Sequence, residues 1–335
     1  MSKWYKKSGD KSEVVVSTRV RLARNLEEYP FPAKLDAAGK KQVNELVRDA
    51  LLGKTENELS YIEMNSLSRA QTISLAERHL ISPEFTGGAA GHALLLSDDE
   101  SVSIMLCEED HVRIQVMEPG LALDSAFERA DKIDNALAAH LPLAFDERIG
   151  YLTQCPTNLG TAMRASVMLH LPGLGRSGQI ARISATVAKL GLIIRGCYGE
   201  GSSPVGDMYQ LSNQVTLGIS EKTAIDNLKS ITQQLVSQEL SMRDRMLNNP
   251  AWEDKIYRAW GTLRSARLLS CEEFMNLASL VRMAAAQGLF DVRLEKIGEL
   301  FADLQPATIN AREGKNLEPA ERDALRAAAV REALA

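Results

Sequence analysis

The chain has 335 residues, 45% hydrophobic and 25% charged, a composition typical of a folded globular protein rather than a disordered or fibrous one. Its 39 basic and 44 acidic side chains give a net charge of −5, which argues against a uniformly basic nucleic-acid-binding surface. No apolar run reaches the roughly 18 residues of a membrane span, and the first residues lack the apolar core of a secretion signal. We therefore expect a cytoplasmic protein with neither nucleic acid nor a membrane as its partner.

The first 250 residues combine short β-strands with amphipathic helices. Strands are predicted at residues 13–24, 93–96, 102–106, 112–117, 165–171, 191–195 and 210–219, where β-branched and apolar residues gather between turn signals. Apolar residues at helical spacing predict helices at 36–52, 124–141, 180–190 and 221–246. The tight polar turns within 93–117 indicate an antiparallel meander.

The pattern changes at Asn248-Asn-Pro250, a helix stop signal. Beyond it, helices are predicted at 252–269, 272–286, 291–304 and 319–334, and Ser270 with Glu273 forms a capping-box signature. At about 100 to 200 residues per domain the length also favours two domains. We therefore predict a domain boundary near residue 250.

The four cysteines and five histidines do not suggest a metal site. The cysteines form no C-x-x-C pair, and the histidines do not cluster at metal-ligand spacing. We expect neither a disulfide framework nor a protein-bound metal, so the chemistry must come from other side chains.

Two nucleotide-binding signatures occur in the sequence; we reject the first and do not favour the second. Gly53-Lys-Thr55 resembles the end of a P-loop, but the first glycine of that motif would fall at Arg48, inside a predicted helix. Gly173 to Gly178 matches G-x-G-x-x-G, with Glu200 near the expected distance for a dinucleotide site. We prefer a flexible glycine-rich loop, because Pro172 fits poorly at the strand-to-turn entry and because Glu200 has a better explanation beside Arg195.

Five arginines lie in or at the ends of predicted strands, where charge is costly. Arg19 and Arg21 alternate along one strand and so share a face, while Arg113, Arg164 and Arg195 belong to three others. Any one of them could be a solvated edge charge. Together, with few acids adjacent to pair with them, they suggest a bound polyanion such as a triphosphate.

Two acidic spots stand beside these arginines. Glu108 to Asp110 precede Arg113, and Glu200 follows Arg195. Neighbouring carboxylates are commonly just a polar turn, but here they would converge with the phosphate ligands. Two carboxylates suit a cationic substrate.

The segment Cys155-Pro-Thr-Asn-Leu-Gly-Thr161 resembles the signature of the phosphagen (guanidino) kinases. Other segments resemble that family in the same order along about residues 14–245: Ser17-Thr-Arg-Val-Arg21, Glu108-Glu-Asp-His-Val-Arg113, Arg164-Ala-Ser-Val-Met168 and Arg195-Gly-Cys-Tyr-Gly-Glu200. The resemblance implies an α+β catalytic domain over residues 1–250, an antiparallel sheet flanked by helices, followed by a small all-α domain over 251–335.

The resemblance also implies a set of site residues. Arg19, Arg21, Arg113, Arg164 and Arg195 match the arginines that clamp the ATP phosphates. Matching nucleotide-contacting positions are Ser17, Thr18, Val20, Ala165, Ser166, Val167, Met168, Gly196, Cys197, Tyr198 and Gly199. His79 is similar to the histidine near the nucleotide, although a core histidine explains its short motif equally well. Glu109 and Glu200 match the carboxylates that hold the substrate guanidinium, and Cys155 matches the cysteine beside it.

The chemistry requires these residue types. A guanidinium has a pKa above 12 and is a poor nucleophile while protonated. Glu109 is our candidate base, and Glu200 would orient the planar group. The arginines, with Mg²⁺ held mainly by phosphate and water, would stabilise the charge of the transition state.

Two features are similar to the bacterial protein-arginine kinases. The Ser17-Thr-Arg-Val-Arg21 segment starts too early for the front domain of the small-molecule enzymes, and about 85 residues follow Pro250. Arg322-Asp-Ala-Leu-Arg-Ala327 matches the R-D-x-x-R-A motif of that family, which implies that Arg322, Asp323, Arg326 and Ala327 bind phosphoarginine. An exposed helix with Arg322 and Arg326 one turn apart is the alternative.

The resemblance therefore implies ATP-dependent phosphorylation of protein arginines in stress response and quality control, with allosteric sensing of phosphoarginine. It further implies a homodimer, a zinc-binding activator protein and a Clp unfoldase as partners. Three alternatives remain: a kinase of free arginine or another small guanidino compound, a phosphoarginine-binding adaptor, and a nicotinamide oxidoreductase that uses Gly173 to Gly178.

Overall fold

The computed structural model describes residues 2–56, 58–196 and 204–335. The predicted site residues Cys197, Tyr198, Gly199 and Glu200 lie outside these ranges.

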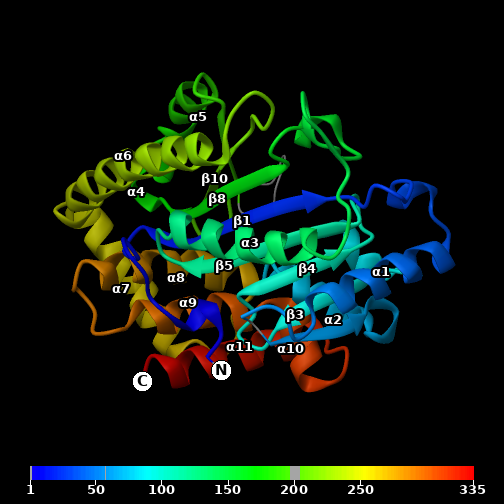
Figure 1. Cartoon of the computed structure of the whole chain (residues 1–335). Helices are drawn as coiled ribbons and strands as arrows, with labels where there is room; N and C mark the ends of the chain where they lie inside the picture. Colours follow the sequence, from blue (N-terminus) through cyan, green and yellow to red (C-terminus); the bar gives the residue numbers. More distant parts are fainter. Residues whose placement is uncertain (1, 57, 197–203) are drawn as a thin grey trace.

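Within the described residues, the centre of the molecule is an eight-stranded antiparallel sheet with the order β2-β3-β4-β5-β1-β8-β10-β9 (Figure 1). Its strands are β1 (Val15–Arg24), β2 (Leu59–Glu63), β3 (Ala93–Ser97), β4 (Val102–Leu106), β5 (Val112–Pro119), β8 (Met163–His170), β9 (Leu192–Gly196) and β10 (Met208–Asn213). A small hairpin, β6 (Phe145–Asp146) and β7 (Gly150–Tyr151), lies apart from it. The predicted α+β class and the β3-β4-β5 meander are confirmed.

The prediction of a strand over 210–219 is wrong beyond Asn213. The Asn213 side chain takes over the pairing with β8, since its Oδ1 accepts from the Ala165 N–H at 2.8 Å and its Nδ2 donates to the Met163 carbonyl at 3.0 Å. Strand β2 at the sheet edge was not predicted, because its residues lack a regular alternation of apolar and polar side chains.

Four predicted helices cover one face of the sheet: α1 (Ala37–Leu51), α3 (Leu123–Ala138), α5 (Ile180–Ala188) and α6 (Glu221–Leu247). Asp36 and Ser220 cap the first turns of α1 and α6 by accepting hydrogen bonds from Gly39 N and Thr223 N. These helices and the inward face of the strands bury the largest apolar cluster, which runs from Val14 to Val236.

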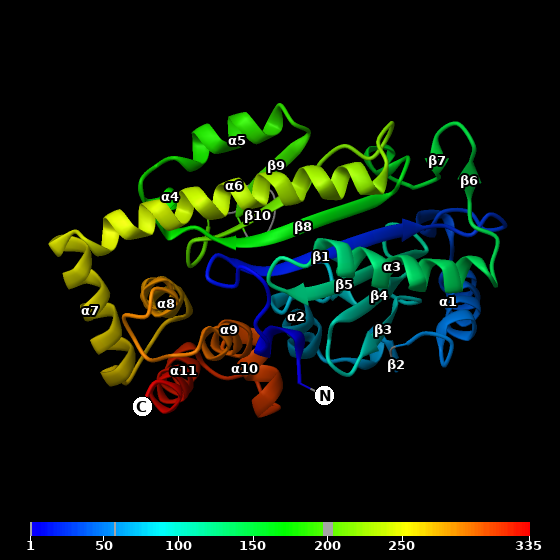
Figure 2. The same cartoon turned by 60° about the vertical axis from the view of Figure 1, so that its left-hand side comes forward.

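The other face is covered in part by α2 (Arg69–Glu77) and by the C-terminal helices (Figure 2). These are α7 (Pro250–Ser265), α8 (Cys271–Ala286), α9 (Leu294–Asp303), α10 (Pro306–Glu313) and α11 (Pro319–Ala333). Of these, α7, α8, α9 and α11 share a second apolar cluster between Met246 and Leu334. The helix α10 was not predicted. The division into domains at residue 250 stays a prediction.

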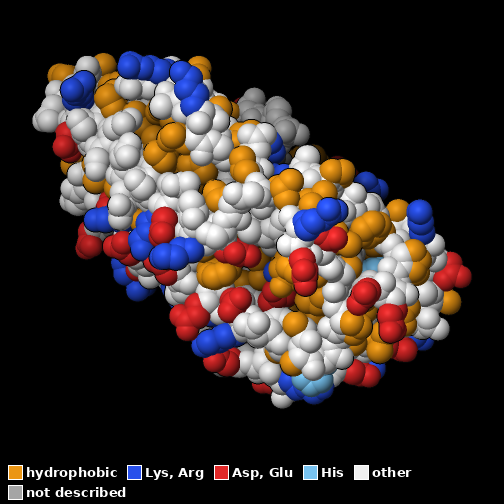
Figure 3. All heavy atoms as spheres, turned by 45° about the horizontal axis from the view of Figure 1, so that its top comes forward, with side chains coloured by type: hydrophobic (Ala, Val, Ile, Leu, Met, Phe, Trp, Pro, Cys, Tyr) orange, Lys and Arg blue, Asp and Glu red, His pale blue; other side chains and the backbone are white. Residues whose placement is uncertain are grey.

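Short 3₁₀ helices connect several of these elements: η1 (Trp4–Lys6), η2 (Pro32–Lys34), η3 (Met64–Ser66), η4 (Glu84–Gly87) and η5 (Pro156–Asn158). Among the helices of the described ranges, none has both the length and the apolar character that a membrane crossing requires. On the face drawn in Figure 3, basic and acidic side chains are interspersed.

The glycine-rich segment after β8 is a short helix, α4 (Pro172–Arg176), so the expectation of a flexible loop is wrong there. The backbone N–H groups of Gly173 and Leu174 donate to the two carboxylate oxygens of buried Glu239, each at 2.9 Å. A carboxylate of the chain itself thus occupies the position where a dinucleotide motif would receive a pyrophosphate.

Candidate active site

The five arginines singled out in the sequence share one face of the sheet. Arg21 on β1 pairs with Arg164 on β8 and with Gln115 on β5, and residues that pair directly lie on the same face. Arg113 is two residues from Gln115 and therefore lies on that face too. Ser166 pairs with both Arg19 and Ser212, and Arg195 pairs with Gln210, two residues before Ser212. We call this surface the arginine face.

The same register divides the predicted nucleotide contacts. Ser17, Ser166 and Met168 share the arginine face, whereas Val20, Ala165 and Val167 alternate to the opposite face and are fully buried in the main core. The three apolar side chains therefore pack the fold and cannot touch a ligand on the arginine face.

The Thr18 side chain also stabilises the fold. Its Oγ1 donates to the Gly120 carbonyl at 2.7 Å and accepts from Ala122 N at 3.0 Å, which fixes the start of α3. Its side chain thus points away from the arginine face.

The guanidinium groups on the arginine face repel one another. Arg19 donates to Gln210 Oε1 at 2.8 Å, yet burial, with Arg113 nearby, lowers the pKa of Arg19 to about 10. Burial and then the Arg19 charge hold the pKa of Arg21 well below its usual range. Burial, Arg195 and Arg113 lower the pKa of Arg164. A bound polyanion would relieve this repulsion.

Arg21 gives a second indication that this face binds an anion. Its Nε is buried and has no hydrogen-bond partner among the described residues. A buried donor without an acceptor is costly, and a phosphate oxygen would satisfy it.

Glu109 lies on the turn between β4 and β5, beside the arginine face. Burial and the neighbouring Asp110 raise the pKa of Glu109, although Arg113 opposes the shift. A carboxylate with a raised pKa is suited to accept a proton.

The segment of Cys155 is tied to the same turn. Asp110 Oδ1 accepts from Gln154 N at 2.9 Å and from Asn25 Nδ2 at 2.7 Å. The Arg164 guanidinium interacts electrostatically with both Cys155 and Glu109, which raises the pKa of Arg164 slightly against the effect of burial. The structure thus brings Glu109, Cys155 and Arg164 of the arginine face together.

Glu108 has a role that the sequence analysis did not identify. It accepts hydrogen bonds from Arg113 Nη1 and Ser82 Oγ, both at 2.6 Å. Burial alone would raise the pKa of Glu108, but Arg113 and Ser82 hold it below its usual value. Glu108 therefore orients Arg113, whereas the pKa of the neighbouring Glu109 is raised.

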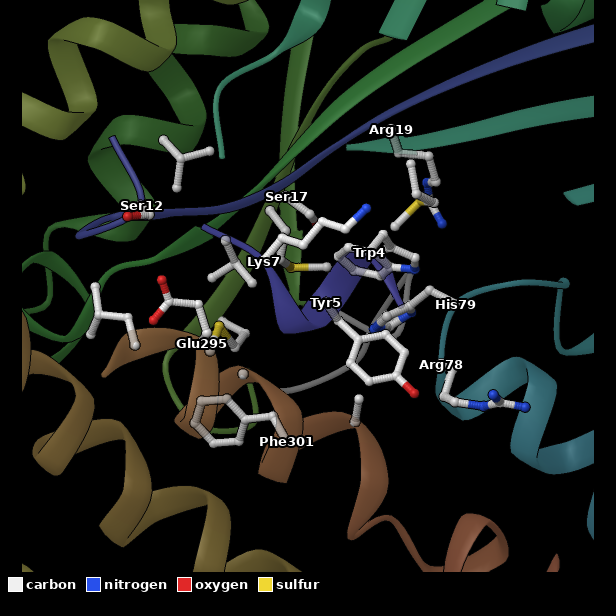
Figure 4. A pocket seen from close by; sticks show the side chains of 18 of the residues that line it. Trp4, Tyr5, Lys7, Ser12, Ser17, Arg19, Arg78, His79, Glu295 and Phe301 are labelled. Atoms are coloured by element: carbon white, nitrogen blue, oxygen red, sulfur yellow. The ribbon is translucent and has the colours of Figure 1, made fainter. Parts of the chain in front are cut away.

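A pocket opens against the arginine face (Figure 4). Ser17, Arg19, His79, Ser166 and Met168, all predicted nucleotide contacts, line it. Burial, and then the Arg19 charge, lowers the pKa of His79 to about 4, so its imidazole is neutral at pH 7. Gln210 also lines the pocket and was not predicted, because its pairing with Arg195 is visible only in the folded sheet.

The residues of the Arg322 to Ala327 motif differ in their exposure to solvent. Arg326 is buried and donates to the carbonyls of Leu269 at 2.7 Å and Leu304 at 3.0 Å, and to Asp323 Oδ1 at 2.7 Å. Ala327 is also buried, whereas Arg322 and Asp323 are partly exposed. The alternative of a fully exposed helix is therefore wrong for Arg326.

In the part of the chain that the structure describes, no three His, Cys, Asp or Glu side chains come together in a group that could hold a metal ion.

Comparison with known proteins matches both parts of the chain. The catalytic domain of the ATP:guanido phosphotransferases matches residues 42–242, and the C-terminal domain of the protein-arginine kinase McsB matches residues 249–335.

Individual proteins agree with these matches. The protein-arginine kinase of Caldanaerobacter subterraneus is 44% identical over 320 residues, which cover 94% of this chain and 95% of that protein. The protein-arginine kinase of Halothermothrix orenii is 42% identical over 334 residues, 99% of this chain and 96% of that one. A solved duplicated taurocyamine kinase from Schistosoma mansoni superposes with a TM-score of 0.63 at 27% identity, covering 72% of this chain and 36% of that chain.

Proposed function

The chain belongs to the family of protein-arginine kinases, enzymes that transfer a phosphoryl group to a guanidino nitrogen, and we propose that its arginine face and Glu109 form the site of this transfer. The full-length match to these kinases supports ATP-dependent phosphorylation of arginine side chains in proteins. The observation that carries the proposed site is the set of mutually repelling guanidinium groups beside a carboxylate of raised pKa.

In the proposed reaction, a nitrogen of the substrate guanidinium attacks the γ-phosphorus of ATP. A nitrogen–phosphorus bond forms, the bond from phosphorus to the β,γ-bridging oxygen breaks, and ADP leaves. The proton lost by the guanidinium passes to the Glu109 carboxylate, so a neutral nitrogen carries out the attack. The products are ADP and an N-phosphorylated arginine.

The arginine face would hold the three phosphates and stabilise the charge on the transferring group. By analogy with the loss of one oxyanion donor, removing one of these arginines would cost about 3 kcal/mol of transition-state stabilisation. The fold family implies ATP as the phosphoryl donor. We propose that Mg²⁺ arrives with the nucleotide and is held mainly by phosphate and water, because these ligands suit it best.

Further roles rest on the resemblance of the sequence. We propose Glu200 as the second carboxylate on the guanidinium and Cys155 as its neighbour. Gly196 continues β9 beyond Arg195; with Cys197, Tyr198 and Gly199 it is proposed to contact the nucleotide.

A comparison of two acceptors tests the proposed substrate. The kinase should phosphorylate arginines of an unfolded carrier protein, and free L-arginine should react at least tenfold more slowly at equal arginine concentration. The measurement is mass spectrometry at neutral pH, because the phosphoramidate is acid-labile. Preferential phosphorylation of free arginine would contradict the proposal and identify a small-molecule kinase.

We further propose that phosphoarginine binds at the partly exposed residues Arg322 and Asp323, while buried Arg326 and Ala327 hold α11 in place. Arg322→Ala should weaken binding of a phosphoarginine peptide about tenfold, since one charge-assisted contact is lost. Isothermal titration calorimetry measures the affinity.

The matched control for this site is Arg331→Ala. Arg331 is also partly exposed on α11, and both arginines donate to a backbone carbonyl, Arg322 to that of Leu317 and Arg331 to that of Ala266. Both variants therefore lose one such bond, and only Arg322→Ala should lose affinity for the peptide. Equal effects of both variants on the affinity would refute this site.

The remaining proposals concern the cell. We propose a homodimer that acts in the cytoplasm in stress response and quality control, with a zinc-binding activator protein and a Clp unfoldase as partners. These proposals rest on the resemblance to the protein-arginine kinases.

A further inference from the structure

The pocket on the arginine face has a second wall that the nucleotide motifs do not include. This wall is formed by the N-terminal segment around η1 and by helices α8 and α9 of the C-terminal region: Trp4, Tyr5, Lys7, Met275, Glu295 and Phe301 are among its residues. Figure 4 shows the labelled side chains Trp4, Tyr5, Lys7, Glu295 and Phe301 around the same space as Arg19 and His79. Segments from both ends of the chain thus complete the pocket.

Trp4 has an unsatisfied donor in this wall. The residue is only 6% exposed, and its indole Nε1 is buried without a hydrogen-bond partner among the described residues. An unpaired buried N–H costs free energy, and such a group in a folded protein calls for an explanation. An acceptor atom on a molecule bound in the pocket would provide the missing partner.

The position of Trp4 is fixed from two sides. On the sheet side, the Trp4 N–H donates to the Asp99 carbonyl at 3.0 Å and Lys3 pairs with Glu100 at 2.9 Å. On the α9 side, Tyr5 donates to Asp303 Oδ1 at 3.1 Å and Lys6 pairs with Glu299 at 2.7 Å. The indole is therefore held in place before any ligand arrives, which lowers the entropy cost of binding.

The chemistry of the pocket indicates the ligand. Its basic end, with Arg19, belongs to the arginine face and suits phosphates. Most of the surface of its other walls is apolar or aromatic, and Met117, Met168, Met275 and Phe301 line it together with the indole. The charged residues Lys7, Glu77, Arg78, Arg282 and Glu295 also line the pocket. A flat heteroaromatic base that carries acceptor nitrogens matches both the apolar walls and the indole N–H.

We propose that Trp4 is a nucleotide-binding residue whose indole N–H donates a hydrogen bond to an acceptor atom of the adenosine part of ATP. The inference rests on the proposed function, because it requires the phosphates of the same nucleotide to lie on the arginine face. The N-terminal segment then contacts the adenosine part while the arginines bind the phosphates.

The test is the affinity of Mg-ADP for the full-length Trp4→Phe variant, measured by isothermal titration calorimetry. Phenylalanine keeps an aromatic ring but lacks the donor, so Kd should rise about tenfold, the effect of one hydrogen bond of roughly 1.4 kcal/mol. Inorganic tripolyphosphate, which has no base, should bind both proteins equally. Trp260→Phe is the matched control, because Trp260 stacks on Phe290 away from the pocket. Unchanged ADP affinity in Trp4→Phe would overturn the proposal.

A second measurement keeps the proposal testable if Trp4→Phe does not fold. The chain has three tryptophans, so the Trp252→Phe/Trp260→Phe variant leaves Trp4 as the sole source of an indole N–H signal in a ¹⁵N-labelled protein. Mg-ADP should shift this resonance and tripolyphosphate should not. No shift with ADP, or equal shifts with both, would refute the role of Trp4. Neither experiment contains a phosphoryl acceptor, so a wild-type protein that binds ADP but phosphorylates no arginine would contradict the proposed function alone.

Discussion

Glu109→Gln is expected to lower kcat for arginine phosphorylation by roughly 10²- to 10⁴-fold, the usual contribution of a positioned general base. The amide has nearly the shape of the carboxylate but cannot accept the guanidinium proton. The affinity for Mg-ADP should stay within a factor of about three, since the phosphates are held by the arginine face. Steady-state kinetics and calorimetry on the same preparation separate the two effects.

A control variant and the pH dependence of the wild-type rate make this prediction specific. Glu84→Gln, an exposed glutamate on η4, should leave kcat unchanged. Because burial raises the pKa of Glu109, the wild-type rate should fall on the acid side with an apparent pKa above the usual glutamate value. The base must be deprotonated to act, so the rate decreases as pH falls through this pKa. A Glu109→Gln enzyme with kcat within about tenfold of wild type would exclude Glu109 as the base.

Glu239→Gln is expected to lower the free energy of unfolding by about 3 to 5 kcal/mol, the typical cost of breaking a buried ion pair. Glu239 and Arg243 are both fully buried and pair at 2.7 Å. The Glu239 carboxylate also accepts hydrogen bonds from the two N–H groups at the start of α4. The Arg243 guanidinium donates hydrogen bonds to the carbonyls of Glu13 and His170 at 2.7 Å each. Without the carboxylate, the guanidinium is left as an uncompensated buried charge.

Urea unfolding followed by circular dichroism measures this loss. Asp254→Asn is the matched control, because Asp254 and Arg258 form an exposed pair with the same spacing on a helix, and its midpoint should not change. The Glu239→Met/Arg243→Met double variant should be more stable than Glu239→Gln, since it leaves no unpaired charge. If Glu239→Gln unfolds at the wild-type midpoint, the pair does not anchor α4 to α6.

Much of the fold was predictable because local patterns agree with tertiary packing. The helices α1, α3 and α6 have apolar stripes at helical spacing, and the meander has tight polar turns. The pattern failed where long-range contacts decide. Glu239 is 66 residues from Gly173, so its bonds to α4 could not be read from the glycine-rich segment.

The arginine face was accessible to sequence reasoning because charge in strands is rare and alternation along β1 places Arg19 and Arg21 on one face. The prediction of nucleotide contacts did not take into account that side chains alternate between the two faces of a strand. This alternation alone would have placed Val20, Ala165 and Val167 on the face opposite the ligand. Trp4 left no local signal. Its role depends on helices α8 and α9, near the other end of the sequence, which come together with η1 only in the folded chain.

The most direct test of phosphoryl transfer to protein arginine is a single-turnover reaction with [γ-³²P]ATP and two peptides. The peptides have identical sequences except that one carries arginine where the other carries lysine. We predict that the label moves to the arginine peptide in an acid-labile form, that the lysine peptide stays unlabelled, and that Glu109→Gln transfers almost none. Label on both peptides, or release of all the label as inorganic phosphate, would contradict the account.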